Sequence, residues 1–332
     1  MIDGDRTVGA GSLSIAERST VEPRISVVVC AYTEDRWEAL TDACRSVRAQ
    51  LDPRDELILV IDHNERLLER ARTAMPDIRV IGNTGARGLS DARNTGVAAA
   101  SRDIVAFLDD DAVPRAGWLG HIRSAFEDPA TAVVGTRVLP RWQGDGRAPR
   151  WFPAEFGWVV GCGYQGQPTR RATVRNPIGA SMAIRRSVLH TVGGFSQVVG
   201  RVGALPVGCE ETELCIRLVQ SMPHLNVVFD PRAAVDHMVP SQRQNLRYFV
   251  RRCFYEGCSK RAVAKLRGNA RALSAERTYV RKVLPAAMLR GVSPARLRHD
   301  PAELLRAGTV ALGLASTVCG FAYAALKRGT VG

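Results

Sequence analysis

The sequence predicts an α/β fold with a mainly parallel sheet, helices on both of its faces, and a C-terminal helical extension. Short, β-branched apolar runs at residues 25–30, 56–61 and 104–108 are typical of strands buried on both faces. Segments with helical spacing of apolar residues lie between them, at 36–50 and 90–100. Ligands of such sheets bind at the carboxyl ends of the strands, so the residues that follow each strand are the candidate site.

The remaining elements follow in chain order. Residues 78–81 and 131–139 favour strands, and residues 140–175, rich in Gly, Pro, Trp and Arg, favour a long loop that closes over substrate. Further along, we expect a strand at 182–184, a helix at 210–221 and a last strand at 227–229. The predicted organisation is a flexible leader (1–24), a main domain (25–240), a basic helical extension (241–300) and an apolar C-terminal helix (301–332).

Composition narrows the class of protein. With 332 residues, 45% of them hydrophobic, the chain can bury a sizeable core, and its net charge of +13 favours anionic partners such as phosphates or lipid headgroups. The eight cysteines form no C-x-x-C pair, as expected for free thiols in a reducing compartment. The leader lacks the apolar core of a signal peptide, so we expect a cytoplasmic protein.

The C-terminal part has two features that suggest a membrane. Residues 307–326 carry no charge, and as a helix they would match the hydrocarbon thickness of a bilayer. Several glycines dilute this segment, so a packing helix and a membrane anchor both remain open. The Arg-rich segment 243–267 precedes it, with aromatic residues in helical register. We expect attachment to the inner face of the cell membrane.

Three consecutive carboxylates, Asp109, Asp110 and Asp111, follow the apolar strand 104–108. Like charges about 5 Å apart repel by about 3 kcal/mol at an effective dielectric of about 20, so a buried strand end needs a reason to carry three. A bound Mg²⁺ or Mn²⁺ is the simplest reason, because both ions take carboxylate oxygens together with substrate phosphates. In an extended chain Asp109 and Asp111 would point to the same side. The alternative to a metal site is a solvated acidic turn.

Other candidate residues are weaker when taken singly. Asp62 ends the second strand, where a carboxylate accepts hydrogen bonds from a ribose or base, but it could also start a turn. Arg93 could neutralise a diphosphate or be a surface cation. Glu210 and Glu211 open a helix, where acidic residues are favoured anyway, yet either could accept a proton from a hydroxyl. His237 could face the same cleft or be structural.

The first strand is not followed by the glycine-rich turn of dinucleotide-binding folds, which disfavours an NAD enzyme. Instead, an ordered set of motifs resembles the family 2 glycosyltransferases over residues 25–240. The matching segments are VVVCAYT (27–33), Asp62, GLSDARNTG (88–96), FLDDDAVP (107–114), GASMAIR (179–185), GGF (193–195) and GCEETELCIR (208–217).

The resemblance implies the GT-A nucleotide-diphospho-sugar transferase fold and an inverting, metal-dependent transfer from a nucleotide diphosphate sugar, with UDP as the expected nucleotide. It places Tyr32, Thr33 and Asp62 at the nucleoside, Arg93 near the nucleotide, Asp109 and Asp110 at the donor, and Asp109 and Asp111 at Mn²⁺ or Mg²⁺. His237 is expected as a further metal ligand. Glu211 aligns with the catalytic base, and Glu210 stays the alternative. The chain departs from the family's usual Glu-Asp pair there, and has Thr33 where many relatives have Asn.

The acceptor is expected to be a hydroxyl, either lipid-linked or on a cell-envelope glycan, with the membrane surface as a partner and no nucleic acid. Two other classes compete. A haloacid-dehalogenase-type phosphohydrolase would use Asp109 and Asp111, but its motif normally closes the first strand and leaves residues 88–96 unexplained. A basic membrane-binding or nucleic-acid-binding protein would use the Arg-rich segment 243–267 alone.

Overall fold

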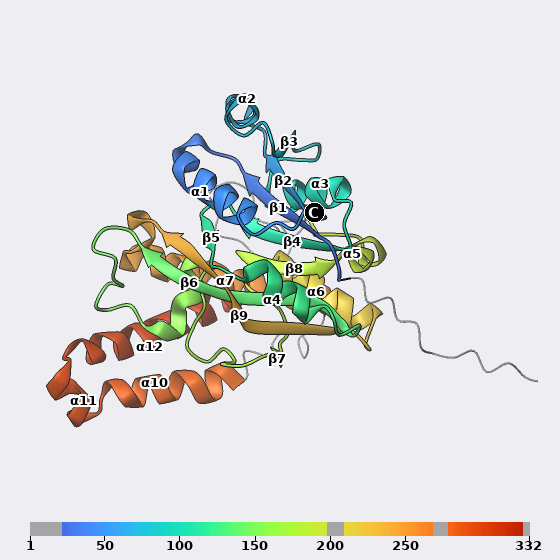
Figure 1. Ribbon diagram of the computed structural model, residues 1–332. Coiled ribbons are helices and arrows are strands. Elements are labelled where there is room, and N and C mark those ends of the chain that lie inside the picture. The colour runs from blue at the N-terminus through green and yellow to red at the C-terminus, as the bar shows by residue number, and fades with distance from the viewer. Residues whose placement is uncertain (1–21, 198–208, 268–277, 328–332) are drawn as a thin grey trace, which may run out of the picture.

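The computed structural model describes residues 22–197, 209–267 and 278–327. Nearly all of the expected leader (1–24) lies outside these residues. The described chain forms one central sheet in the order β3-β2-β1-β4-β8-β6-β9-β5, with β7 paired to β9. Helices pack on both faces of the sheet, and a group of C-terminal helices lies beside one end of it (Figure 1). The predicted α/β class is confirmed.

The first half of the sheet is parallel, as its sequence pattern predicts. Its strands are β1 (Ile25–Ala31), β2 (Glu56–Ile61), β3 (Arg79–Gly82) and β4 (Ile104–Asp109), connected by α1 (Trp37–Arg48), α2 (Glu65–Ala74) and α3 (Leu89–Ala99). A short 3-10 turn, η1 (Glu34–Arg36), precedes α1. Because these strands run the same way, their polar carboxyl ends meet at one edge of the sheet.

Alternate residues of each strand pack into two separate cores, which explains the uninterrupted apolar runs. Val27 and Val29 of β1 face α1, α2 and α4 (Trp118–Ala125), whereas Val28 faces α3, α5 (Arg186–Val192) and α6 (Glu210–Ser221). Gly96 in α3 lies directly against Val28, where an added methyl group would meet Val28 Cγ1 at 2.4 Å. The helix therefore packs close to the strand.

The second half of the sheet is mixed. β8 (Ser181–Arg185) runs antiparallel between β4 and β6 (Thr131–Trp142), and β9 (Asn226–Val239) runs parallel to β6. β5 (Ala112–Pro114) and β7 (Ala172–Thr173) pair antiparallel with β9. The strands β6 and β9 are longer than their apolar patterns indicate, because β9 continues past a register shift opposite Thr136 and Arg137. The expected loop 140–175 accordingly contains the end of β6, the 3-10 helix η2 (Ala154–Val160) and β7.

The C-terminal helices pack on the sheet and on one another. A turn, η3 (Ser241–Arg243), leads into α7 (Leu246–Arg267); after the gap come η4 (Tyr279–Val283), α10 (Leu284–Gly291), α11 (Pro294–His299) and α12 (Ala302–Leu326). α12 crosses α7 in backbone contact, because a methyl group added at Gly320 would lie 1.9 Å from the Phe254 carbonyl oxygen. The glycines that dilute the apolar segment therefore allow helix packing.

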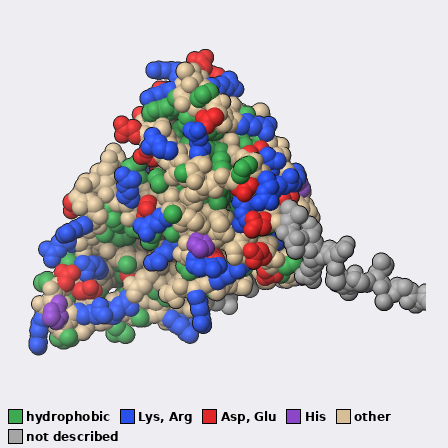
Figure 2. All heavy atoms as spheres, viewed as in Figure 1, with side chains coloured by type: hydrophobic (Ala, Val, Ile, Leu, Met, Phe, Trp, Pro, Cys, Tyr) green, Lys and Arg blue, Asp and Glu red, His purple; other side chains and the backbone are tan. Residues whose placement is uncertain are grey.

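Two surface properties of this region are relevant to a membrane. α12 is long and apolar enough to cross a bilayer by length and composition alone, and the core helix of a soluble protein can pass the same test. Large apolar side chains are exposed at Leu289, Leu304 and Leu305. Figure 2, viewed as in Figure 1, shows Lys and Arg side chains along the lower edge of the molecule, where the C-terminal helices lie.

Candidate active site

One cavity of about 860 Å³ joins the carboxyl edge of the sheet to the C-terminal helices. Its wall contains both acidic clusters that the sequence singles out, with Asp109 and Asp111 from the end of β4 and Glu210 and Glu211 from the start of α6. His237 and Arg93 also line it. The structure thus brings together most of the predicted catalytic and metal-binding residues.

The aspartates at the end of β4 lie beside a histidine of β9. Residues 235–237 of β9 pair with β5, which sets His237 opposite Ala112, the residue that follows Asp111. His237 Nε2 is 3.1 Å from Asp111 Oδ1 and 4.0 Å from Asp109 Oδ2. On the other side of its ring, Nδ1 lies 3.5 Å from the Cys162 thiol. The imidazole is buried and held from both sides.

This arrangement fits a divalent cation. Asp109, Asp111 and His237 each offer one ligand atom, and the three atoms lie within 4.8 Å of one another. Asp111 Oδ1 is buried and lies 3.1 Å from His237 Nε2, so two of these ligand atoms are already side by side. Carboxylate oxygens with an imidazole nitrogen suit Mn²⁺, and carboxylates with water suit Mg²⁺.

Arg36 compensates part of this negative charge, although no local sequence pattern marks it as a site residue. Its guanidinium donates to Asp110 Oδ1 at 2.5 Å, to Asp111 Oδ2 at 3.2 Å and to the Tyr32 hydroxyl at 2.8 Å. Burial would raise the pKa of Asp111, but His237 and Arg36 outweigh it and hold the pKa well below its usual range. The pKa of Asp110 is raised to about 7, because burial together with the neighbouring aspartates outweighs Arg36.

Asp110 does not line the cavity as Asp109 and Asp111 do. Its side chain is buried beneath Arg36, and one of its carboxylate oxygens has no hydrogen-bond partner among the described residues. Asp110 and Asp111 lie in the turn after β4, and both of their carboxylates contact the same nitrogen of Arg36. The expected contact of Asp110 with the donor stays a prediction.

The residues expected at the nucleoside are not among the described residues that line the cavity. Asp62 accepts hydrogen bonds from Asn83 Nδ2 at 2.7 Å and from the Gly88 amide at 2.9 Å, which fix its carboxylate at the end of β2. Thr33 caps η1 through its hydroxyl. Tyr32 is 56% exposed, with the Arg36 guanidinium 5.0 Å from the centre of its ring.

Arg93 links the two acidic clusters. It is buried on α3 and contacts Glu210 Oε1 at 3.0 Å and Asp109 Oδ1 at 3.5 Å, and it donates to the Gly179 carbonyl at 2.9 Å. The surface-cation alternative for Arg93 is therefore wrong. These contacts occupy most of the guanidinium N–H donors of Arg93, so its main role is to hold Glu210 and Asp109 in place.

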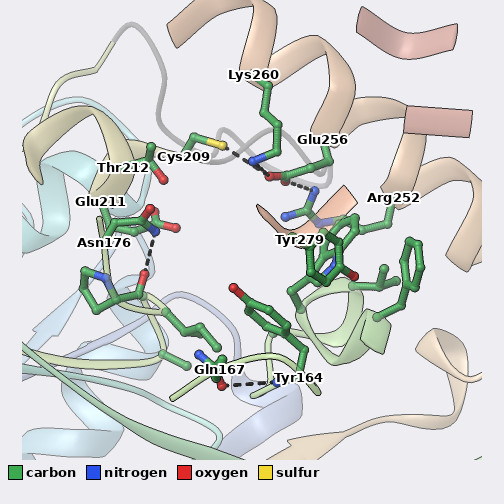
Figure 3. A pocket seen from close by; sticks show the side chains of 18 of the residues that line it. Tyr164, Gln167, Asn176, Cys209, Glu211, Thr212, Arg252, Glu256, Lys260 and Tyr279 are labelled. Atoms are coloured by element: carbon green, nitrogen blue, oxygen red, sulfur yellow. Dashed lines mark hydrogen bonds and ion pairs between the residues drawn. The ribbon is translucent and has the colours of Figure 1, made fainter. Parts of the chain in front are cut away.

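Glu211 has a different environment from Glu210. Figure 3 shows it on the cavity wall beside Thr212 and Asn176, and no other described side chain forms an ion pair or hydrogen bond with its carboxylate. Burial, and next the charge of Glu210, raise the pKa of Glu211 to about 7. A carboxylate of this kind is a stronger base than an exposed one and is poised to accept a proton near neutral pH.

Part of the site comes from residues that had only weak sequence signals. Arg252, Glu256 and Lys260 of α7 line the cavity opposite Glu211 (Figure 3). Their spacing of four residues, with an acid between two cations, predicts ion pairs on one helix face, but it does not indicate where that face lies. The aromatic side chains between residues 142 and 158 mainly form a core around Phe249. Phe156 and Trp158 also line the cavity.

Comparison with known proteins identifies the family. The family model described as Glycosyl transferase family 2 matches residues 26–193. The chain is 34% identical over 244 residues to a glucosyl-dolichyl phosphate glucuronosyltransferase of Haloferax volcanii, an alignment that covers 72% of this chain and 77% of the relative. It is 32% identical over 182 residues to a pre-mycofactocin glycosyltransferase of Mycobacterium tuberculosis, covering 54% of this chain and only 36% of that protein.

Solved structures share the fold. A mannosyltransferase from Pyrobaculum calidifontis, in complex with GDP-Man and Mn²⁺, superimposes with a TM-score of 0.57 at 18% identity, covering 91% of this chain and 88% of that chain. GalNAc-T7, solved with UDP, GalNAc and Mn²⁺, gives a TM-score of 0.51 at 15% identity, covering 81% and 58%. The fold is that of GT-A glycosyltransferases, and the chain belongs to the family 2 glycosyltransferases.

Proposed function

We propose that this enzyme transfers a sugar from a nucleotide diphosphate sugar to a hydroxyl of a lipid-linked or cell-envelope acceptor, with inversion at the anomeric carbon. The observation that carries the proposal is the presence of both acidic clusters in one cavity. Asp109 and Asp111 lie at one place on its wall and Glu211 at another, as a donor site and a base require. The printed name of the Haloferax relative supports an acceptor joined to a lipid phosphate.

The donor nucleotide would bind at the carboxyl ends of β1, β2 and β4. Asp62 is fixed by Asn83 and Gly88 in the position from which a carboxylate accepts hydrogen bonds from a ribose or base. The exposed ring of Tyr32 offers a face for a base to stack on. We propose UDP as the nucleotide, as the resemblance implies.

Asp109, Asp111 and His237 would hold Mn²⁺ or Mg²⁺, with Arg36 and Arg93 fixing the aspartates. When bound, such an ion stabilises negative charge on a diphosphate oxygen. Cys162 orients His237 by contact with its Nδ1 atom, so Nε2 faces the aspartates. The buried thiol is therefore a positioning group for the histidine.

The transfer itself would be a single displacement. The acceptor oxygen forms the new bond to the anomeric carbon while the bond from that carbon to the diphosphate oxygen breaks, and the acceptor proton passes to Glu211. The nucleotide diphosphate leaves with the bonding electron pair. Attack on the face opposite the leaving group inverts the configuration. Glu210, paired with Arg93, helps to keep the pKa of Glu211 raised.

We further propose that the enzyme acts in the cytoplasm, on the inner face of the cell membrane. Exposed leucines on α10 and α12 (Leu289, Leu304, Leu305) lie close in sequence to the exposed cations Arg296 and Arg298 of α11. Apolar and basic side chains on neighbouring short helices suit an interface with anionic lipid. Whether α12 also spans the membrane is not needed for this proposal.

The phosphohydrolase alternative is not favoured. Asp109 ends β4, the fourth strand along the chain, whereas the phosphohydrolase motif normally closes the first strand. The purely basic-surface alternative does not account for the cavity or its buried carboxylates.

The function is tested by a donor panel with the purified full-length enzyme. Thermal shift against UDP-, GDP- and TDP-sugars with Mn²⁺ identifies the donor, because a ligand of the native state raises the melting temperature. Transfer is then followed by release of the nucleotide diphosphate with membrane lipids as the acceptor source. We expect one nucleotide class to give the largest shift and to support transfer. Phosphate release from simple phosphomonoesters, without any effect of nucleotide sugars, would contradict the proposal.

A further inference from the structure

The cavity extends well beyond the donor site. Tyr32, Thr33 and Asp62 are not among the described residues that line it. The cavity begins at Asp109 and Asp111, passes Glu211 and continues between α7, η4, α10 and α12. Its volume of about 860 Å³ is near the upper end for small-molecule sites, which are about 300–1,000 Å³. Most of this space is therefore available to the transferred sugar and the acceptor.

The far wall of the cavity is apolar and comes from the C-terminal helices. η4 and α10 contribute Val283 and Leu284, and α12 contributes Leu314, Val318 and Phe321. The close crossing of α12 with α7 at Gly320 fixes this wall in position. A sugar chain alone would leave such a wall in contact with water, whereas an alkyl or prenyl chain would cover it.

A charged group lies on the same wall, next to the catalytic end. The Glu256 carboxylate is buried and pairs with Arg252 at 2.7 Å and with Lys260 at 3.0 Å. Burial would raise the pKa of Glu256, but Lys260 and Arg252 outweigh it and keep the carboxylate ionised. Both cations thus lie beside one ionised carboxylate on the cavity wall.

This charged group is tied to the helix that carries the proposed base. Cys209, the residue before Glu210, places its thiol 3.7 Å from Glu256 Oε1. Figure 3 shows Lys260, Glu256 and Arg252 across the cavity from Glu211 and Asn176. An anion held by Arg252 and Lys260 would therefore lie on the acceptor side of Glu211.

We propose that this chamber is the acceptor subsite and that it takes an amphiphile in which a single apolar chain is joined to a phosphate. The chain covers the wall formed by Leu284, Leu314 and Phe321, and the phosphate faces Arg252 and Lys260. The guanidinium of Arg252 and the ammonium of Lys260 are charged donors of the kind that bind phosphate oxygens, and an uncharged lipid would offer them no anionic group. This inference rests on the proposed function and adds where the acceptor binds and by which chemistry.

Direct binding without donor tests the apolar half of the proposal. Calorimetry on the full chain in detergent, with farnesyl phosphate, farnesol and inorganic phosphate as probes, should give saturable binding of farnesyl phosphate, at least about tenfold weaker binding of farnesol, and none of inorganic phosphate. Leu314→Trp fills the chamber and should weaken both lipids at least about tenfold. Leu312→Trp, on the exposed face of the same helix, should change neither. Equal effects of the two variants would overturn the assignment.

The phosphate-binding part of the proposed subsite is tested by substitutions on α7. Lys260→Gln keeps a donor for Glu256 but removes the charge, so it should weaken farnesyl phosphate about tenfold and leave farnesol unchanged. The exposed Lys265→Gln on the same helix is the matched control and should have no effect. Loss of affinity for both lipids in Lys260→Gln, or inorganic phosphate binding as tightly as farnesyl phosphate, would overturn it.

The same variants separate this inference from the proposed function. Mn²⁺-dependent binding of the donor nucleotide should be normal in Leu314→Trp and Lys260→Gln, because neither residue contacts the aspartates or His237. If donor binding and transfer occur but both variants bind the lipid probes as tightly as the wild type does, the proposed subsite is wrong and the proposed function stands. If the lipid probes respond as expected but no nucleotide sugar is used, the proposed function is wrong.

Discussion

The two acidic clusters of the cavity differ in the charges that surround them. At the end of β4, Asp111 lies between His237 and Arg36, and its pKa is held low. At the start of α6, Glu211 has no cation bound to it among the described residues, and its pKa is raised to about 7. Carboxylates of similar intrinsic acidity thus differ in function through their surroundings: one stays ionised to bind a cation, and the other can exchange a proton.

The largest effect is expected when Asp111, the carboxylate that stays ionised, is removed. Asp111→Ala should lower transfer by at least about 10³-fold, because it removes one of three ligand side chains of the proposed metal site. Steady-state kinetics with saturating Mn²⁺ measures it. Asp236→Asn, one residue before His237 and paired with Arg115 outside the cavity, is the control and should keep wild-type turnover. Unchanged turnover of Asp111→Ala would refute the metal role.

The next largest effect is expected when Glu211, the proposed base, is replaced. Glu211→Gln keeps the shape of the side chain but cannot accept the acceptor proton, so kcat should fall at least about 10²-fold while donor affinity is retained. Single-turnover measurements and donor titration separate the two quantities. A variant that loses donor affinity instead would assign Glu211 to the donor site.

Glu210→Gln should have a smaller effect, of about tenfold, because Glu210 acts through its ion pair with Arg93 and Arg93 keeps Asp109 and the Gly179 carbonyl. Turnover is compared with that of Glu211→Gln under the same conditions. If Glu210→Gln is the inactive variant and Glu211→Gln is not, the base is Glu210.

The raised pKa of Glu211 predicts a pH dependence of both rate and stability. Transfer needs the ionised form, so the rate should fall about tenfold per pH unit below about 7, and this limb should be absent from the residual activity of Glu211→Gln. In the unfolded chain Glu211 ionises near its ordinary value of 4.5. The contribution of Glu211 to the free energy of unfolding is therefore greatest below pH 4.5 and is lost as pH rises to about 7.

Consequently, Glu211→Gln should melt at the wild-type temperature near pH 4.5 and at a higher temperature above about pH 7, because it avoids burying a charge. Thermal melting of both proteins from about pH 4.5 to about pH 8.5 measures this smallest of the effects. A difference in melting temperature that does not change with pH would contradict the raised pKa.

The sequence predicts those parts of the site that follow directly from strand ends. Asp62, Asp109 and Asp111 each follow or end a buried parallel strand, and such ends must meet at one edge of the sheet. The acidic start of α6 is also readable from the sequence. These positions follow from local patterns of side chains, so no knowledge of the long-range packing is needed to find them.

Other parts of the site depend on geometry that local patterns do not contain. His237 reaches Asp111 only because β9 resumes after a register shift, whereas its apolar run alone indicates a strand at 227–229. Arg36 follows β1 without any motif that marks it as a partner of Asp110 and Asp111. The C-terminal helices line the cavity through a crossing at Gly257 and Gly320, and in the sequence Gly320 only weakens an apolar segment.

The most direct test of the central claim is calorimetric titration of UDP into the full-length enzyme with and without Mn²⁺, compared between wild type and Asp111→Asn. This substitution keeps the size of the side chain and removes its charge. We expect Mn²⁺ to tighten UDP binding at least about tenfold in the wild type and to have no effect in the variant. Equal tightening by Mn²⁺ in both proteins would contradict the assignment of the metal to Asp109, Asp111 and His237.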